Sequence, residues 1–369
     1  MTLVEPAYGS RSLGDLLPGV ARALGHDLGS PSGFELPEAG SYVVFLVDGL
    51  GHEQLSAHAD VAPYLASLPG TPGTAGVPST TATSLTSLGT ALTPGRHGVV
   101  GFTVRIPGTD DLLNHLWWDV TAVDPIVWQP HPTAFARLAA DGVQVTTVSR
   151  RNFAGSGLTA AGQRGARFVG ADKVGEGIAA AVSAAGRSPS LTYLYDGDLD
   201  WTGHRYGVDS TAWRQQLAMI DAEAERLAEA LPSGARLVVV ADHGMVDSPQ
   251  DARLDVDEQP GLRDGVALVG GEARFRHLYC RHGAVDDVAA RWREVLGERA
   301  TVLTRDEATL RGWFGPVDPQ VRGRIGDVVV ACHGAHAVMA SADFPHENSL
   351  VGLHGSLTSA EMLIPVLVG

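Results

Sequence analysis

The run SYVVFLVDG, residues 41–49, constrains the fold more than any other stretch of the chain. Five apolar residues follow Tyr42 without interruption, and three of them are β-branched valines. Such a run is typical of a strand that is buried on both faces, which indicates a parallel strand inside a larger sheet. The strand ends at Asp48 and a glycine turn. Because the carboxyl ends of parallel strands form the edge at which α/β proteins bind ligands, Asp48 is the first candidate site residue.

Three further strands of this kind are predicted, and each follows a helical pattern. They begin near Val143, Ser190 and Arg236, after helices expected near residues 135–140, 174–185 and 211–231. Strands that alternate with helices predict an α/β protein with a doubly wound, mostly parallel central sheet flanked by helices. Two of these strands are followed by aspartates, Asp200 and Asp242, which extends the acidic edge that begins at Asp48.

The rest of the chain is expected to frame this sheet. Residues 1–40 have one short helical pattern and are predicted to form a surface lead-in. Residues 254–326 are less regular and are expected to form a smaller inserted subdomain, while GDVVVAC and MLIPVLVG are expected to be closing strands. The prediction is a single catalytic domain, residues 1–369, with the insertion inside it.

Composition restricts the class of partner. Hydrophobic residues make up 44% of the 369 residues and charged residues 19%, which describes a soluble globular protein. The formal net charge of −15 argues against a nucleic-acid duplex as partner, although bound metals can still make a small phosphorylated substrate acceptable.

We find no signal peptide or membrane-spanning segment. One disulfide between Cys280 and Cys332 or a reduced cytoplasmic protein both fit the cysteines, and we favour the latter. The oligomeric state is left open.

A cluster of hydroxyl groups occupies the stretch from Val77 to Phe102. Leucines follow this cluster at spacings of three and four, so it is expected at the start of a helix buried along one face. A helix N-terminus presents free N–H groups and suits an anion. A hydroxyl there is either an N-cap or a nucleophile aimed at a phosphoryl group, and these residues alone do not decide between the two. The hydroxyl residues are Thr80, Thr81, Thr83 and Ser84.

Aspartates and histidines supply a candidate metal centre. Each of them alone has an ordinary explanation, as a turn former or as a hydrogen-bonded core or surface histidine. Together they form the ligand set that zinc and similar divalent ions prefer in the absence of thiolates. With Thr81 they are enough for two neighbouring ions. The six residues are Asp48, Asp200, His204, Asp242, His243 and His354.

This combined pattern resembles the alkaline phosphatase superfamily, and within it the nucleotide pyrophosphatase/phosphodiesterase branch. The resemblance covers most of the chain and leaves only residues 254–326 unanchored. It rests on the aspartate after the first buried strand, a proline-to-threonine nucleophile segment, an Asp-x-x-x-His motif, an Asp-His-Gly-Met motif and a late His-Gly. In this sequence these are Asp48; Pro78, Thr81, Pro94, His97 and Gly98; Asp200, His204, Tyr206 and Gly207; Asp242 to Met245; and His354 with Gly355.

The resemblance implies an alkaline-phosphatase-like fold and a two-metal hydrolase. Thr81 would be the nucleophile, and cleavage of phosphodiester or nucleotide pyrophosphate bonds would pass through a covalent phosphothreonine. One ion would be held by Asp48, Asp242, His243 and the Thr81 oxygen, and a second by Asp200, His204 and His354. Zinc is the first expectation for both ions, with Mn²⁺ or iron as alternatives.

Substrate contacts and substrate class are less constrained. The branch typically places an asparagine near the nucleophile, and Ser84 is the nearest polar replacement one turn beyond Thr81. Phe102, Asn114 and Trp117 are further candidates, although core packing explains the aromatic residues equally well. His97 is expected to be a structural cap. A phosphomonoesterase, a phosphonate C–P hydrolase and a non-catalytic phosphate-ligand binder remain alternatives, whereas a sulfatase is disfavoured because no cysteine lies near Thr81.

Overall fold

A six-stranded sheet forms the centre of the fold in the computed structural model, which describes residues 3–369. The strand order is β18-β8-β1-β7-β5-β6, with five parallel strands and β18 antiparallel at one edge. The predicted α/β class with a mostly parallel sheet is confirmed. The strands are β1 (Ser41–Val47), β5 (Gln144–Ser149), β6 (Arg167–Gly170), β7 (Ser190–Asp196), β8 (Ala235–Val240) and β18 (Val366–Val368).

The register of β1 explains how the acidic edge forms. All seven residues of β1 are buried, because the strand lies between β7 and β8 and is covered on both faces. Leu46 pairs with Val240 in β8, so the chain leaves both strands at the same edge of the sheet. Asp48 and Asp242 are therefore neighbours although 194 positions separate them in the sequence.

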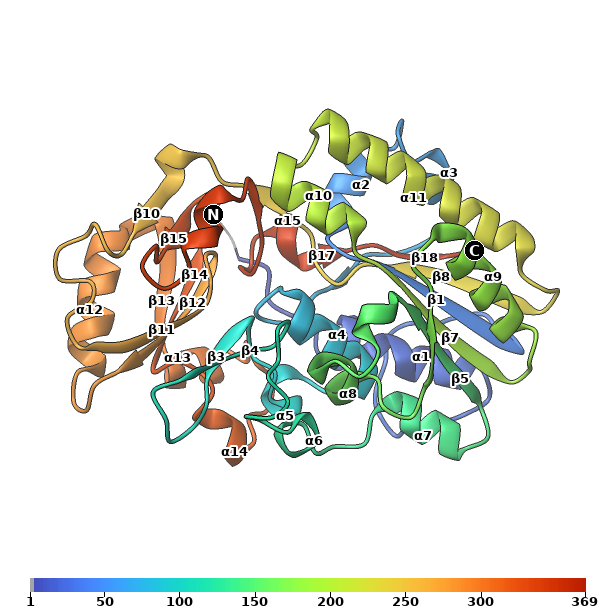
Figure 1. Ribbon diagram of the computed structural model, residues 1–369, viewed down its shortest axis with the longest axis horizontal. Helices are drawn as coiled ribbons and strands as arrows, with labels where there is room; N and C mark the ends of the chain where they lie inside the picture. The colour runs from blue at the N-terminus through green and yellow to red at the C-terminus, as the bar shows by residue number, and fades with distance from the viewer. Residues whose placement is uncertain (1–2) are drawn as a thin grey trace.

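Helices cover both faces of the sheet, as Figure 1 shows. The predicted helices before β5, β7 and β8 are all present. One face carries α2 (His52–Ala57), α3 (Pro63–Ser67), α9 (Val174–Ala185), α10 (Asp198–Tyr206) and α11 (Thr211–Ala230). The other face carries α1 (Leu16–Ala23), α4 (Thr81–Thr90), α7 (Ala134–Ala140) and α8 (Gly157–Gly162).

Two expectations about burial were wrong. The predicted surface lead-in contains α1, whose Leu16, Leu17 and Val20 are completely buried against α4 and α7. In addition, all ten residues of α4 are buried, rather than one face only. The reason is shared: α1, α7 and α8 enclose α4 on the sides that the sheet does not cover. The hydroxyl-rich composition of α4 therefore belongs to a helix in the interior, not to an amphipathic surface helix.

A second, antiparallel sheet lies beside the first (Figure 1, orange strands). It has its own hydrophobic core, which includes Trp292 of the covering helix α12 (Val285–Leu296). The segment GDVVVAC was expected to close the main sheet, but it forms β14 between β12 and β13 instead, so the second sheet reaches past residue 326. MLIPVLVG does supply the closing strand β18. The four strands, in sheet order, are β11 (Val266–Glu272), β12 (Phe275–Cys280), β14 (Val328–Cys332) and β13 (Ala300–Thr304).

The division into one domain with an inserted subdomain stays a prediction. Short helices, turns and strands make up the rest of the chain. The short helices are α5 (Pro94–His97), α6 (Pro125–Trp128), α13 (Arg305–Leu310), α14 (Pro319–Arg322) and α15 (Ser359–Met362), with 3₁₀ turns η1 (Leu13–Asp15), η2 (Arg151–Phe153), η3 (Gln250–Ala252), η4 (Gly297–Arg299) and η5 (Pro345–Ser349). The short strands are β2 (Gly73–Thr74), β3 (Thr103–Arg105), β4 (Leu112–Asn114), β9 (Val246–Asp247), β10 (Arg253–Asp255), β15 (Ala337–Met339), β16 (Gly352–Leu353) and β17 (Leu363–Ile364).

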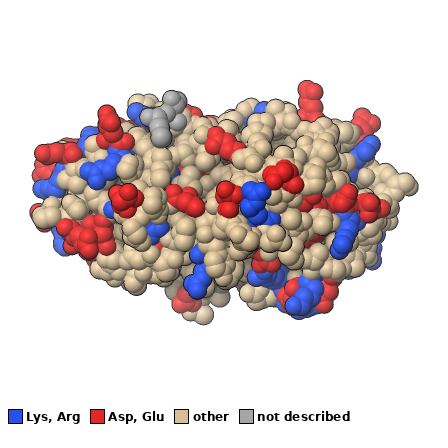
Figure 2. Space-filling view, turned by 90° about the horizontal axis from the view of Figure 1, so that it is seen from above, with Lys and Arg blue, Asp and Glu red and all other residues tan. Residues whose placement is uncertain are grey.

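Charged side chains are spread over the surface. On the face drawn in Figure 2, acidic and basic side chains are interspersed, and that face shows no extended basic area. Within residues 3–369, no helix combines the length and the apolar character that crossing a membrane requires. Cys280 and Cys332 are both free thiols.

Candidate active site

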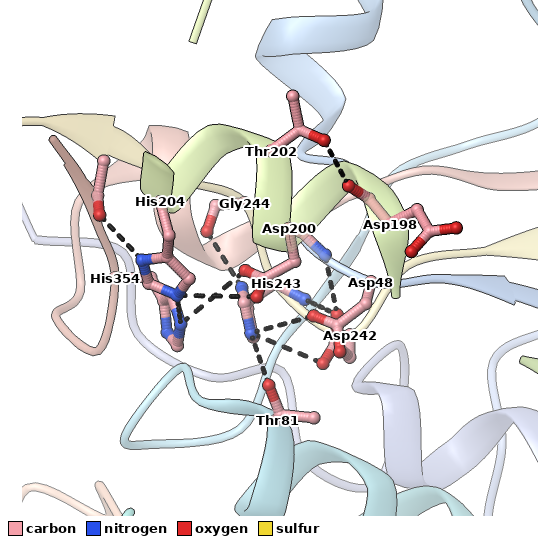
Figure 3. Close-up of polar contacts among 12 residues, drawn as sticks. Asp48, Thr81, Asp198, Asp200, Thr202, His204, Asp242, His243, Gly244 and His354 are labelled. Carbon is pink, nitrogen blue, oxygen red and sulfur yellow. Dashed lines mark hydrogen bonds and ion pairs between the residues drawn. The ribbon is translucent and has the colours of Figure 1, made fainter. Parts of the chain in front are cut away.

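The first group of site residues lies where β1 and β8 leave the main sheet (Figure 3). Asp48 follows β1, and Asp242 and His243 follow β8; all three are almost completely buried. His243 Nε2 lies 3.4 Å from Asp48 Oδ1 and 3.4 Å from Asp242 Oδ2. The backbone N–H groups of Gly49 and His243 both donate to Asp242 Oδ1, which leaves Asp242 Oδ2 facing the histidine.

The second group comes from α10 and from the segment after β16. Asp200 was expected at the end of a strand, but β7 already ends at Asp196 and Asp200 lies in the first turn of α10. His204 lies one helical turn later on the same face, 3.4 Å from Asp200. His354 completes the group, with its Nε2 3.2 Å from His204 Nε2 and 3.8 Å from Asp200 Oδ1.

The two groups of candidate ligands lie next to each other. Single ligand atoms of Asp48, Asp242 and His243 lie within 4.8 Å of one another, and so do those of Asp200, His243 and His354. The rings of His243 and His354 stack at a centroid distance of 3.7 Å. His243 therefore lies close enough to either group to contribute a ligand, and its expected assignment to the first ion stays a prediction.

Hydrogen bonds fix which nitrogen of each histidine faces the site. The Nδ1 atoms of His204, His243 and His354 each contact a backbone carbonyl oxygen, so each Nδ1 carries a proton and donates. The three Nε2 lone pairs then face inward, where Asp48 Oδ1 and Asp200 Oδ1 are buried without a hydrogen-bond partner. Converging lone pairs and unpartnered carboxylate oxygens fit divalent cations and fit no network of protons among these groups.

In the metal-free protein, burial destabilises the ionised carboxylates of the site. Desolvation raises the pKa of Asp48 well above its usual value, and the neighbouring carboxylates of Asp242 and Asp200 raise it further. Desolvation also raises the pKa of Asp242 and holds the pKa of His354 well below its usual value. Bound cations would offset both effects, because they favour ionised carboxylates and neutral imidazoles.

Thr81 faces the first group from the opposite side. It is the first residue of α4, after Thr80 as N-cap, and Thr80 makes no side-chain capping bond. Thr81 Oγ1 lies 3.2 Å from His243 Nε2, to which it donates. This hydroxyl therefore lies at a helix N-terminus and against a group of candidate metal ligands, which is the arrangement expected of a nucleophile and not of a cap.

Hydrogen bonds connect the loop before Thr81 to the late His-Gly segment. The Ser79 N–H donates to the Gly355 carbonyl oxygen over 3.1 Å, and His354 Nδ1 donates to the Ser79 carbonyl oxygen over 2.9 Å. Glycine is required at position 49, in the turn after β1, because this turn packs against α10. Gly49 has φ +75°, and a Cβ there would lie 2.9 Å from the Asp200 Cβ. Close backbone approach therefore brings the loop after β1 against the second ligand group.

Two cavities meet at Thr81. The first, about 330 Å³, extends toward Phe153 and Tyr195, and the second, about 470 Å³, extends toward Phe102 and Glu272. Thr81 and Asp200 line both cavities, as do three apolar residues: Leu116, Trp117 and Trp201. The two tryptophans are 71% and 61% exposed, so they form an apolar rim around the mouth of the site.

Two of the four candidate substrate contacts line the cavities, and two do not. Phe102 and Trp117 line the second cavity with their rings packed edge to face. Ser84 is completely buried and lines neither cavity, and its hydroxyl has no hydrogen-bond partner; Leu85 lines the first cavity in its place. Asn114 lines neither of these two cavities, but its Oδ1 accepts from the N–H groups of Leu116 and Trp117 and so holds the turn that presents Trp117.

Other polar residues near the site were assigned differently or missed. His97 is buried, with Nε2 2.9 Å from Ser87 Oγ, as expected of a structural residue. Tyr195 was missed, although its hydroxyl donates to Asp48 Oδ2 over 2.5 Å. The period of two in β7 could have found it, because Tyr195 and Tyr193 lie on the same side of a strand next to β1. Glu272 in β11 has no signal in the sequence that connects it to the site.

The fold is shared with solved structures of known proteins. Murine ectonucleotide pyrophosphatase / phosphodiesterase 5 superposes with a TM-score of 0.69 at 16% identity, covering 88% of this chain and 87% of that one. An inactive variant of that protein, solved in complex with AMP, gives 0.68 at 15% identity, with coverages of 88% and 87%. Phosphonoacetate hydrolase from Sinorhizobium meliloti 1021, in complex with phosphonoformate, gives 0.67 at 20% identity, with 91% of each chain covered.

The comparison with curated proteins returned no match. The family model described as type I phosphodiesterase / nucleotide pyrophosphatase matches residues 42–357. This range includes Thr81, the six candidate metal ligands and the residues that line both cavities. The chain therefore belongs to the type I phosphodiesterase / nucleotide pyrophosphatase family, within the alkaline phosphatase superfamily.

Proposed function

We propose that this protein is a two-metal hydrolase that cleaves phosphodiester or nucleotide pyrophosphate bonds through a covalent phosphothreonine on Thr81. The observation that carries the proposal is the contact between Thr81 Oγ1 and His243 Nε2, at the point where both ligand groups and both cavities meet. Membership of the family supports a phosphoric ester hydrolase.

Asp48, Asp242 and His243 would hold one ion together with the Thr81 oxygen, and Asp200, His204 and His354 would hold the second. When bound, such ions lower the pKa of a hydroxyl nucleophile and stabilise negative charge on the leaving oxygen. The inward Nε2 lone pairs and the unpartnered carboxylate oxygens of these residues support this assignment. Zinc suits the mixture of aspartate and histidine, and Mn²⁺ or iron would also accept it.

The chain itself orients the reaction. The N-terminus of α4 points the Thr81 hydroxyl and free N–H groups toward the phosphoryl group, and its dipole favours the negative charge there. The burial of His243 and Asp242 excludes water from the side behind the nucleophile, where water could compete with the hydroxyl. After the first transfer, a water molecule on the open side must displace Thr81 from phosphorus.

The pair of cavities favours a diester over a monoester. A phosphodiester carries organic groups on two of its oxygens, and a cavity of several hundred Å³ extends to each side of Thr81. The rim formed by Trp117 and Trp201, together with the ring of Phe153, suits planar or apolar groups such as a nucleoside base or an aryl ester.

Phosphonate hydrolysis is the second candidate. The fold is shared with phosphonoacetate hydrolase at 20–21% identity, and Arg205 lines the second cavity, where a substrate carboxylate could pair with it. A phosphomonoesterase would leave one cavity empty, and a non-catalytic binder would not need the Thr81 contact.

The decisive experiment compares three substrates on zinc-loaded protein: bis-p-nitrophenyl phosphate, p-nitrophenyl phosphate and phosphonoacetate. We expect the highest kcat/KM for the diester. Acid quenching during turnover should trap a phosphorylated peptide that contains Thr81, and mass spectrometry should find no such peptide in Thr81→Ala. Turnover without a trapped intermediate on this peptide would refute the phosphothreonine route.

A further inference from the structure

The two cavities at Thr81 differ in the positive charge that they offer to a substrate. One arginine lines each cavity, Arg150 the first and Arg205 the second. Arg150 forms an ion pair with Asp198, so the protein itself already balances its charge. Within the described residues 3–369, the Arg205 guanidinium forms no ion pair and donates no hydrogen bond. The second cavity therefore has an arginine available for an anionic ligand, in a protein with a formal net charge of −15.

Helix α10 places Arg205 at the mouth of the second cavity. Arg205 is exposed and directly follows His204, which faces the ligand groups, in the last turn of the helix (Figure 3). Trp201 lies four residues earlier, so Trp201 and Arg205 occupy the same face of α10. Both residues line the second cavity, and Trp201 forms part of its apolar rim. The guanidinium is therefore accessible to a group bound in this cavity.

Two glutamates line the same cavity without pairing with Arg205. Glu347 of η5 bonds to the Arg276 guanidinium of β12. Glu272, the last residue of β11, accepts a hydrogen bond from the Phe102 N–H through Oε2, and its Oε1 is buried. Neither carboxylate occupies the guanidinium, which leaves it as a partner for an anion that the substrate brings.

The second cavity lies on the side from which the leaving group departs in the proposed reaction. Thr81 Oγ1 contacts His243 of the first ligand group. His204 and His354 of the second group line the second cavity and not the first. In an in-line displacement, the leaving oxygen lies opposite the attacking oxygen. The leaving group would therefore occupy the second cavity, beside Arg205, and the group retained on phosphorus would occupy the first.

We propose that Arg205 is a specificity-determining residue, which selects substrates whose leaving group carries a phosphate of its own. This inference rests on the proposed function. With a nucleoside triphosphate, Thr81 Oγ1 bonds to the innermost phosphorus and its proton passes to water. The bond from that phosphorus to the bridging oxygen breaks, and its electron pair leaves on pyrophosphate, to which the guanidinium donates charge-assisted hydrogen bonds. Water then displaces Thr81 and releases the nucleoside monophosphate. A neutral ester group offers Arg205 no such partner.

The test compares two substrates that transfer the same group to zinc-loaded protein. Thymidine triphosphate and the p-nitrophenyl ester of thymidine monophosphate both release thymidine monophosphate, but only the triphosphate has further phosphates on its leaving side. Arg205→Gln should lower kcat/KM for the triphosphate roughly ten- to a hundredfold, the range for one lost hydrogen bond to a charged group. It should leave kcat/KM for the ester nearly unchanged. Each variant is compared with the wild type on the same substrate, which removes the difference in reactivity between the two leaving groups.

Arg226 of α11 supplies the matched control. It is also exposed, it forms no ion pair in the part of the chain that the structure describes, and it lines neither cavity at Thr81. Arg226→Gln removes the same charge and should leave kcat/KM unchanged for both substrates. A second readout avoids turnover: in the Thr81→Ala background, calorimetry should show that Arg205→Gln weakens binding of thymidine triphosphate by a similar factor and leaves binding of thymidine monophosphate unchanged.

The possible results separate this inference from the proposed function. Wild-type kcat/KM of Arg205→Gln on the triphosphate would overturn the inference. Equal losses on both substrates together with a lower melting temperature would also overturn it, because they would show that Arg205 only stabilises the C-terminal end of α10. A loss on phosphonoacetate without one on the triphosphate would assign Arg205 to a carboxylate instead. Wild-type protein that cleaves the ester but not the triphosphate would refute the inference alone, whereas cleavage of neither substrate would refute the proposed function.

Discussion

Replacing Tyr195 with phenylalanine should weaken metal binding without touching a ligand. The hydroxyl of the half-buried Tyr195 donates to Asp48 Oδ2 over 2.5 Å, and it keeps its proton because desolvation raises its pKa well above the usual value. It therefore stabilises the ionised form of Asp48, which is the form that a cation needs. Loss of one hydrogen bond to a charged group costs about 1.5–3 kcal/mol, or roughly ten- to a hundredfold in affinity.

The assay is a competition titration of zinc against a chelator of known affinity, on Tyr195→Phe and on the wild type. Tyr193 offers a matched control, because it lies two residues earlier in β7 and its buried hydroxyl has no hydrogen-bond partner. Tyr193→Phe should bind zinc as tightly as the wild type. The reasoning is refuted if Tyr195→Phe retains wild-type affinity, or if both variants lose affinity equally, which would indicate a general loss of packing.

Other expected outcomes follow from the same geometry. Thr81→Ala should lower kcat by several orders of magnitude with zinc still bound, and Thr80→Ala should be much milder; the reverse order in steady-state kinetics would reassign the nucleophile. Chelation should abolish activity and added zinc should restore it, as measured by turnover and metal analysis. Arg274→Ala should destabilise the fold by about 3–5 kcal/mol in urea, because it leaves Glu361 buried and unpaired. Since the pKa of Glu272 rises on folding from 4.5 to about 8, metal-free protein should lose stability as the pH rises through this interval, and Glu272→Gln should lessen that loss in thermal melts.

The sequence predicts those parts of the fold in which the spacing of apolar residues indicates which side of an element is buried. The apolar run at Ser41–Val47 and the helices before β5, β7 and β8 follow local rules, and their order alone indicates a parallel sheet. The burial of α1 and the complete enclosure of α4 depend on which helices pack together, which no local pattern records. The same limit applies to Val328–Cys332: an apolar strand fits either sheet, and only its pairing with β12 and β13 assigns it.

The candidate site divides in a similar way. The residue types and their order were enough to propose Asp48 and Asp242 as ligands, because carboxyl ends of strands meet at one edge. His354 was proposed from its residue type and from the resemblance to the family. The proximity of His243 to both groups of candidate ligands, with its ring stacked on that of His354 at 3.7 Å, is a tertiary detail without a sequence signal. Ser84 shows the converse error: helical spacing from Thr81 was read as proximity to substrate, but at that position the helix faces the protein interior.

The chemistry and the selectivity of this site come from different parts of the fold. Asp48 and Asp242 leave the parallel sheet, and backbone hydrogen bonds within a few residues fix Asp242 and His243 there. The outer wall of the second cavity, in contrast, is built from Glu272 of the second sheet, which hydrogen bonds couple to the Phe102 backbone. We therefore expect substitutions in the second sheet to change which ester group is accepted while Thr81 and the candidate metal ligands stay in place. For this reason the family assignment constrains the reaction more tightly than it constrains the substrate.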